Sequence, residues 1–218
     1  MLFRDRFDAG EQLARKLKAY ANRSNVLVLA LPRGGVPVAY QVAKTLNAPL
    51  DVLLVRKLGV PGREELAMGA IASGGVRVLN EELIQTLNIS EADIQEVAAK
   101  EQQELKRREK AYRGNLPPLD VSDRTVILVD DGLATGATMR VAAMALREEQ
   151  CREIIGAVPV SAPEICNIYT MDVDQMICAE TPQPFYAVGL WYENFSQTTD
   201  EEVRELLNRA ASQQPIPS

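Results

Sequence analysis

The sequence predicts an α/β fold in which helices cover both faces of a mainly parallel sheet. Two observations support this class. Short apolar runs, typical of buried strands, alternate with amphipathic helical segments. The order strand, loop, helix, strand also occurs twice, over residues 26–55 and 125–160. Ligands of such folds bind at the carboxyl ends of the strands, so the loops there are the first places to look for a site.

The composition indicates one domain with one substantial core. The chain has 218 residues, 46% of them hydrophobic, and its 24 basic and 30 acidic side chains give a formal net charge of −6. This acidic balance disfavours a nucleic-acid partner. No apolar run is long enough to cross a bilayer, and the first twelve residues lack the apolar core of a signal peptide. We therefore expect a cytoplasmic protein without a membrane partner.

Two residue counts restrict the chemistry. Histidine is absent, which excludes Ser-His-Asp and Cys-His hydrolase arrangements and any histidine-held metal. The three cysteines, Cys151, Cys166 and Cys178, are an odd number without CxxC spacing. We expect them to be small buried thiols, since neither a disulfide framework nor a zinc site is indicated. Catalysis would depend on carboxylates, cations and backbone groups.

The first third of the chain is predicted to contain two helices and two strands. Asp8 and Glu11 have the spacing of a capping box for a first helix with apolar positions up to Tyr20. An apolar strand follows over residues 26–31, then a loop over 32–37, a helix reaching Leu46 and a strand over 51–55. Residues 55–76 contain glycines at positions 59, 62, 69, 74 and 75, between short apolar pieces, and predict a mobile loop flanked by short strands.

The remaining elements include a helical insertion and a small C-terminal hood. Ser90 opens a charged helix to about Arg113, and we place a helical insertion over residues 80–120. A strand over 125–129, a helix over 139–149 and a strand over 154–160 follow. A short helix near 165–169, a strand over 175–180 and a last apolar strand over 186–190 complete the sheet. Thr199 and Glu202 then form a capping box for a final helix, residues 180–213 form the hood and helix, and the last residues are predicted to be disordered.

The run TVILVDDGLATGAT, residues 125–138, is the most informative segment. A buried strand leads to the adjacent carboxylates of Asp130 and Asp131, and a loop rich in glycine and threonine then opens a helix. Unpaired N–H groups at a helix start attract phosphate, while carboxylates suit sugar hydroxyls or a metal. A P-loop would need a lysine directly after its second glycine, and none follows Gly136. An ordinary strand-to-helix turn is the alternative.

This segment resembles the 5-phosphoribosyl-1-pyrophosphate signature of the type I phosphoribosyltransferase family, which is an apolar strand, two acids and an ATGAT-like loop. The resemblance covers about residues 26–160 and implies the family's fold. It also implies that Asp130 and Asp131 contact the ribose hydroxyls. The 5′-phosphate would be held by the loop residues Ala134, Thr135, Gly136, Ala137 and Thr138.

The segment PRGG, residues 32–35, is the second motif. Arg33 offers a forked cation for phosphate oxygens, and Gly34 and Gly35 let a ligand approach the backbone. By position and type this segment resembles the family's pyrophosphate loop, which often includes a strained or cis peptide, so we expect such a peptide near residues 32–34. A plain Gly-Gly turn is the alternative for this motif taken alone.

Two further segments resemble parts of the family's site. Arg56 and Lys57 resemble basic residues that reach the pyrophosphate, and residues 58–67 would be the flexible loop that closes over the site. In VGLWYENF, residues 188–195, Trp191 or Tyr192 would stack on a base and Glu193 would lie near the metal. Packing of this aromatic pair in the core or hood is the alternative.

The resemblance implies an enzyme that transfers ribose 5-phosphate from phosphoribosyl pyrophosphate to a nitrogenous acceptor, such as a nucleobase, and releases pyrophosphate. Arg56, Lys57, Asp130 and Asp131 would be catalytic, and Mg²⁺ would be the cofactor, held weakly or indirectly by Asp130, Asp131 and Glu193. The partners would be small molecules, and a homodimer is compatible with the family. A non-catalytic module that senses phosphoribosyl pyrophosphate or a nucleotide, and a hydrolase or scaffold subunit, are the alternatives.

Overall fold

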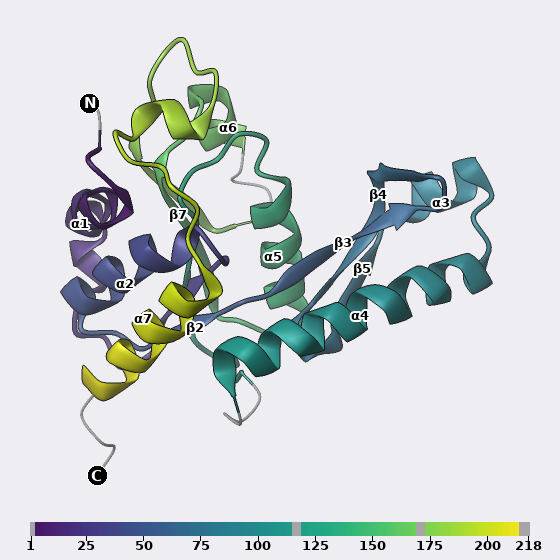
Figure 1. The fold of residues 1–218 in the computed structure, drawn as a ribbon, viewed down its shortest axis with the longest axis horizontal. Helices are drawn as coiled ribbons and strands as arrows, with labels where there is room; N and C mark the ends of the chain where they lie inside the picture. Colours follow the sequence, from purple (N-terminus) through teal and green to yellow (C-terminus); the bar gives the residue numbers. More distant parts are fainter. Residues whose placement is uncertain (1–2, 115–118, 169–172, 214–218) are drawn as a thin grey trace.

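The predicted parallel sheet is present and forms the centre of the molecule (Figure 1). A computed structural model describes residues 3–114, 119–168 and 173–213. Five parallel strands lie in the order β2-β1-β6-β7-β8. They are β1 Val26–Ala30, β2 Leu50–Val52, β6 Thr125–Val129, β7 Glu153–Val160 and β8 Gln175–Glu180. The α/β class expected from the sequence is therefore confirmed.

Helices cover both faces of this sheet because successive strand residues point to opposite sides. One face packs with helices α1 (Arg6–Lys16), α2 (Gly35–Leu46) and α7 (Asp200–Gln213), and the other packs with α5 (Ala137–Glu148) (Figure 1). The first face includes Val28, Ile127 and Ile155, and the second includes Leu27, Val126 and Ile154. Every residue of β1 and β6 is buried, so the carboxyl ends of these strands are firmly placed.

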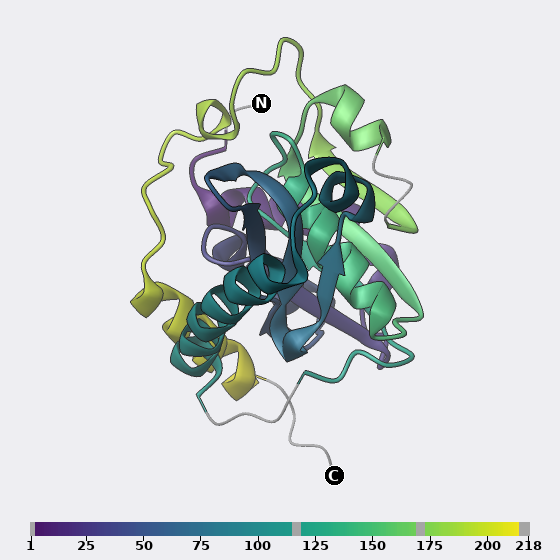
Figure 2. The same cartoon turned by 90° about the vertical axis from the view of Figure 1, so that its right-hand side faces the viewer.

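A second, antiparallel sheet and a long helix form an arm beside the parallel sheet (Figure 1), and Figure 2 views the molecule from the end of this arm. Its strands are β3 (Val55–Val60), β4 (Arg63–Ala72) and β5 (Arg77–Leu79). Helices α3 (Glu81–Leu87) and α4 (Glu91–Arg113) follow, and Ser90 caps α4 as expected. Helix α4 packs along both β3 and α7, which brings it next to the carboxyl edge of the parallel sheet.

The prediction of a mobile loop between residues 55 and 76 is wrong, because β3 and β4 form a hairpin there. Pro61 and Gly62 make the turn, and Gly62 has a φ of 73°, which glycine adopts without strain. Gly59 allows the two strands to approach closely, since a Cβ at this position would lie 2.7 Å from the carbonyl oxygen of Glu64. Glycine thus serves both the turn, at Gly62, and a close strand contact, at Gly59, although the frequency of glycine suggested a loop.

Two other predicted elements differ. The first helix is capped by Asp5, whose Oδ1 accepts a 2.9 Å hydrogen bond from the Asp8 amide, so the cap lies three residues earlier than predicted. The last apolar strand is absent: residues Val188–Trp191 form the 3₁₀ turn η4. Tyr186 and Leu190 are 79% and 64% exposed, so this apolar run has no sheet face to bury. The final capping box is confirmed, with Thr199 and Glu202 bonding reciprocally at 3.0 and 3.1 Å.

The cysteine prediction is wrong for two of the three residues. Cys166 and Cys178 form a disulfide that joins α6 (Pro163–Ile168) to β8, while Cys151 is a half-buried free thiol. Their pairing depends on α6 folding back beside β8, which spacing along the chain does not reveal. The tail predicted to be disordered was residues 212–218: Ser212 and Gln213 are instead the last residues of α7, and residues 214–218 lie outside the described residues. Within those residues, no helix combines the length and apolar character that a membrane span requires.

Candidate active site at the carboxyl edge of the sheet

The two acids of the strongest motif lie directly at the end of β6. Asp130 and Asp131 follow the last buried strand residue, Val129, and both are half-buried. The Asp131 amide donates a 2.8 Å hydrogen bond to Oδ1 of Asp130, which fixes the first carboxylate against the turn. Because the strand ends here, the two carboxylates face the loops that follow the neighbouring strands.

Burial makes both carboxyl groups harder to ionise. The pKa of Asp130 is raised well above its ordinary value, first by burial and then by the neighbouring charge of Asp131. Burial also raises the pKa of Asp131, and the Arg6 guanidinium opposes this shift. A pair of closely spaced acids with raised pKa values is typical of a functional site.

Arg6, which the sequence analysis did not identify, is the principal partner of Asp131. Its Nε donates to Oδ2 of Asp131 at 2.8 Å, and Nη1 donates to the carbonyl of Ser196 at 2.7 Å. The guanidinium also stacks 4.0 Å above the ring of Phe195, and the side chain is only 11% exposed. Helix α1 thus connects the acid pair to the segment before α7. Nothing in the sequence distinguishes Arg6 from the nearby Arg4, because 125 residues separate Arg6 from its partner.

The PRGG loop lies against the acid pair. The peptide between Pro32 and Arg33 is cis, which confirms the expected unusual peptide. A Cβ on Gly34 would collide with the Asp131 carboxylate, and a Cβ on Gly35 would lie 2.7 Å from the Val129 carbonyl oxygen. Both glycines are therefore required for this close approach. The two sequence motifs, from β1 and β6, form one contiguous site.

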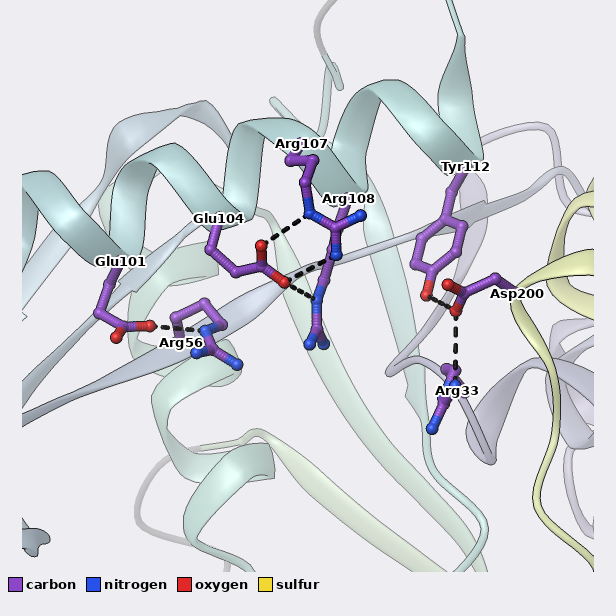
Figure 3. A network of polar contacts seen from close by, with 8 residues as sticks. All are labelled: Arg33, Arg56, Glu101, Glu104, Arg107, Arg108, Tyr112 and Asp200. Carbon is purple, nitrogen blue, oxygen red and sulfur yellow. Dashed lines mark hydrogen bonds and ion pairs between the residues drawn. The ribbon is translucent and has the colours of Figure 1, made fainter.

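The side chain of Arg33 has a partner of its own. Its Nη1 lies 3.6 Å from Oδ1 of Asp200 at the start of α7, and the Tyr112 hydroxyl donates to the same carboxylate oxygen at 2.6 Å (Figure 3). The hydrogen bond from Tyr112 lowers the pKa of Asp200, so this group is a carboxylate at neutral pH. The contact joins the PRGG loop to α4 and α7.

The glycine and threonine loop opens α5 beside the acids. Gly136 is buried, and the other predicted phosphate-binding residues of this loop are exposed. These exposed residues are Ala134, Thr135, Ala137 and Thr138. Gly136 has a φ of 72° and directly precedes the helix, which begins two residues earlier than predicted. The Ala137 amide donates to Oγ1 of Thr135 at 3.5 Å. The first N–H groups of an α-helix have no partner within the helix, so the start of α5 is a candidate anion site.

Arg56 and Lys57 lie inside β3, so neither follows the end of a strand as predicted. Arg56 Nε bonds Glu101 of α4 at 2.7 Å (Figure 3), whereas the side chain of Lys57 is exposed. The two residues have opposite orientations because successive strand residues alternate in direction. Arg56 therefore points to α4, and Lys57 points to the other side of the hairpin.

The aromatic segment is mainly structural. Tyr192 is 5% exposed, its hydroxyl donates to the Asp131 carbonyl at 2.6 Å, and its ring packs on Phe3 and Phe195. Tyr192 therefore packs in the core, the alternative given for this aromatic pair, and its 5% exposure leaves little ring surface for a base. Trp191 is half-buried against the same cluster, and Glu193 is exposed, with its amide bonded to the Phe3 carbonyl.

The acids offer few ligands for a metal. Among the described residues, no group of three or more histidine, cysteine, aspartate or glutamate side chains could hold an ion. Asp130 has one carboxylate oxygen bonded to an amide, and Asp131 is bonded to Arg6. Mg²⁺ commonly takes one or two carboxylates and completes its shell with substrate oxygens and water. The site fits Mg²⁺ only in that shared arrangement.

Comparisons with known proteins agree with this geometry. A family model described as a phosphoribosyl transferase domain matches residues 3–69 and 61–167. Two curated proteins from the CDC 1551 and H37Rv strains of Mycobacterium tuberculosis, which carry only provisional phosphoribosyl transferase names, are each 46% identical over 209 residues. These alignments cover 96% of this chain and 47% of each relative, so the chain spans about half the length of those relatives.

A solved structure is also similar over nearly the whole chain. The crystal structure of TT1426 from Thermus thermophilus has a TM-score of 0.85 and 39% sequence identity, and the match covers 96% of this chain and 99% of that one. The arm and the parallel sheet therefore form an arrangement that a solved protein shares.

Proposed function

The chain belongs to the phosphoribosyl transferase family, and from this premise we propose that it transfers ribose 5-phosphate from 5-phosphoribosyl-1-pyrophosphate to a nitrogenous acceptor. The main support is the contact of Gly34 and Gly35 with the acid pair. The PRGG loop and the acid pair therefore adjoin at one edge of the sheet, next to the start of α5, which supports one site for the diphosphate, the ribose and the 5′-phosphate. Phosphoribosyl pyrophosphate carries these three groups in the same order: diphosphate, ribose and 5′-phosphate.

The proposed reaction is a displacement at C1 of the ribose. A nitrogen of the acceptor forms a bond to C1, the bond from C1 to the diphosphate oxygen breaks, and diphosphate leaves with the electron pair. The acceptor loses its N–H proton to solvent. Asp130 and Asp131 would hold the ribose hydroxyls and stabilise the positive charge that develops on the ring. Arg33 would stabilise the charge on the leaving diphosphate, and the start of α5 would hold the 5′-phosphate.

The roles of the two basic residues of β3 follow from their directions. Arg56 faces α4, where it pairs with Glu101. It would release Glu101 and bind the diphosphate when the donor is present. Lys57 would reach the donor only if the hairpin moved, so its proposed catalytic role depends on closure over the site. Trp191 is the remaining aromatic candidate for contact with a nucleobase.

Mg²⁺ is the proposed cofactor. Asp130 and Asp131 would hold it together with donor oxygens, and Glu193 would contribute indirectly. When bound, the ion would neutralise negative charge on the diphosphate. The protein's part is to fix the acids, through the Asp131 amide and Arg6, and to supply guanidinium groups.

A non-catalytic module that senses phosphoribosyl pyrophosphate or a nucleotide is a second candidate. It is favoured by the counterions, since Arg6 holds Asp131 and Asp200 holds Arg33 before any ligand binds. Such a module would bind the donor and leave it intact.

One experiment separates these candidates. The protein is incubated with phosphoribosyl pyrophosphate and Mg²⁺ while purines, pyrimidines and small amines are added one at a time, and diphosphate release is measured. Acceptor-dependent release that is lost in the double variant Asp130→Asn with Asp131→Asn supports the transferase. Binding of the donor without release supports the sensor, and release without an acceptor indicates a hydrolase. Undiminished transfer by the double variant refutes the assigned site.

A further inference from the structure

A third arginine reaches the proposed donor site from helix α4. A small cavity of about 30 Å³ lies where the PRGG loop, β3, α4 and the start of α5 meet. Its lining includes Pro32 of the PRGG loop, Arg56 of β3, Arg108 of α4 and Thr138 of the phosphate loop. Arg108 therefore lines the same cavity as residues of both sequence motifs, although it belongs to the charged helix to which the sequence analysis assigned no part in the site.

The only hydrogen-bond partner of Arg108 among the described residues is Glu104, one turn earlier on the same helix. Arg108 Nε lies 2.7 Å from Oε1 of Glu104, and the Arg108 side chain is 38% exposed (Figure 3). A guanidinium has five N–H donors, so the donors on the terminal nitrogens are available to a further anion. Figure 3 shows this guanidinium pointing away from the axis of α4.

Three arginines from three different elements thus lie on or next to the PRGG loop, since Arg56 and Arg108 line the cavity beside Pro32 and Arg33 belongs to the loop itself. Arg33, Arg56 and Arg108 each have one carboxylate partner, which is Asp200, Glu101 and Glu104 respectively (Figure 3). Two of these carboxylates lie on α4 itself. Each arginine is part-exposed, with side-chain exposures between 33% and 38%, so a ligand can replace its partner. A multiply charged diphosphate has enough oxygens to bond several guanidinium groups at once.

We propose that Arg108 binds the diphosphate end of the donor and that Glu104 is its partner in the ligand-free protein. The proposal rests on the proposed function for the identity of the donor. It assigns a substrate-binding role to helix α4, which then forms one wall of the site. The chemistry that Arg108 recognises is a diphosphate or pyrophosphate ester.

Arg107 provides a matched control for this proposal. It bonds the same carboxylate, with Nε 2.8 Å from Oε2 of Glu104, but its side chain is 64% exposed and does not line the cavity. The variants Arg108→Gln and Arg107→Gln therefore remove the same charge from neighbouring positions of one helix. Both variants leave Glu104 with one arginine, so general effects on the helix are matched.

The test measures the affinity of inorganic diphosphate, ribose 5-phosphate and phosphoribosyl pyrophosphate by calorimetry in the presence of Mg²⁺. Loss of a charge-assisted hydrogen bond corresponds to at least about a tenfold loss of affinity. We expect Arg108→Gln to weaken binding of diphosphate and phosphoribosyl pyrophosphate about tenfold, and ribose 5-phosphate less than about twofold. Arg107→Gln should change each affinity less than about twofold, and Arg108→Lys should restore part of the loss. Thermal unfolding confirms that each variant folds.

The possible results separate this proposal from the proposed function. Equal effects of Arg108→Gln and Arg107→Gln, or a loss confined to ribose 5-phosphate, overturn the role of Arg108. If the unmodified protein binds diphosphate but not phosphoribosyl pyrophosphate, the proposed donor is wrong, while the diphosphate affinities still decide the role of Arg108. If the unmodified protein binds none of the three ligands, both proposals are wrong.

Discussion

Arg6 Nε donates a 2.8 Å hydrogen bond to Oδ2 of Asp131, and this bond connects the first helix of the chain to the second acid of the β6 motif. The same guanidinium bonds the Ser196 carbonyl and stacks on Phe195. One side chain therefore positions an acid of the proposed ribose grip and the segment that precedes α7. Because Arg6 is largely buried, removing it leaves Asp131 without its principal partner.

The first prediction concerns this positioning. Arg6→Gln should lower kcat/KM for phosphoribosyl pyrophosphate about 10- to 100-fold, since a hydrogen bond to a charged group contributes about 1.5–3 kcal/mol. Arg4→Gln is the matched control, because the Arg4 side chain is 72% exposed and its one ion pair within the described part of the chain is with Asp8, at 3.4 Å. Steady-state kinetics with the best acceptor measures both variants. Equal losses in the two variants would contradict a specific role for Arg6.

The second prediction concerns pH. Burial raises the pKa of both acids, so the pair stays protonated at a pH where an ordinary aspartate, with a pKa of about 4, has ionised. The affinity for the donor should therefore rise with pH, and the midpoint of this rise should lie above the ordinary pKa of aspartate. Arg6 lowers the pKa of Asp131, so Arg6→Gln should move this midpoint to still higher pH.

The measurement for this prediction is the dissociation constant of the donor between about pH 4 and pH 9, with Arg4→Gln as the reference. A midpoint at the ordinary aspartate pKa, or a midpoint that moves to lower pH in Arg6→Gln, would contradict the predicted direction of the pKa shifts. Stability should follow the opposite course. Since these acids have a higher pKa in the folded chain, their contribution to stability decreases as pH rises through that pKa.

The sequence revealed the motifs whose place in the fold is determined by the element that directly precedes them in the chain. Asp130 and Asp131 follow a fully buried strand, so their place at the sheet edge could be predicted. The PRGG loop follows β1 in the same way, and because β1 and β6 are neighbours, contact between the two motifs follows from the topology. The parallel direction of the strands was also predictable, because a helix connects each strand to the next in both strand, loop, helix, strand units.

The contacts that the sequence did not reveal are made between distant elements. Arg6 and Asp131 are 125 residues apart, and Tyr112 and Asp200 are 88 apart, so no local pattern records either pair. For Trp191 and Tyr192 the sequence left both base stacking and core packing open, because an aromatic side chain at a predicted strand end has the same sequence signature whether its ring is free or packed. Only the fold, which places Phe3 against it, separates these two cases.

The third prediction concerns the disulfide. The bond between Cys166 and Cys178 closes a short loop, with a sequence separation of 12, between α6 and β8. Replacing both residues by serine should lower the free energy of unfolding by about 2–3 kcal/mol, since the unfolded chain gains freedom. Urea unfolding with and without a reductant measures the effect. Reductant should destabilise the unmodified protein and Cys151→Ser, whereas the double variant should not respond, and a response of the double variant would contradict this assignment.

The last prediction concerns the contact between the two motifs. In Gly34→Ala the new Cβ would collide with the Asp131 carboxylate, which Arg6 holds in place. An unrestrained carboxylate could rotate away at little cost, but here any movement also stretches the bond to Arg6. Gly34 has a φ of −59°, so alanine itself fits the backbone, and the strain falls on the acid.

We therefore expect Gly34→Ala to lower kcat/KM at least tenfold, while the free energy of unfolding falls by only about 1 kcal/mol. Gly114→Ala is the control, because its Cβ would meet no atom of the described residues within 4 Å, although its φ of 60° adds backbone strain. That variant should lose a similar amount of stability and keep its activity. The double variant Gly34→Ala with Arg6→Gln tests the argument further, since a released Asp131 can move aside. Its activity should then be no lower than that of Arg6→Gln alone, and additive losses would show that the two residues act independently.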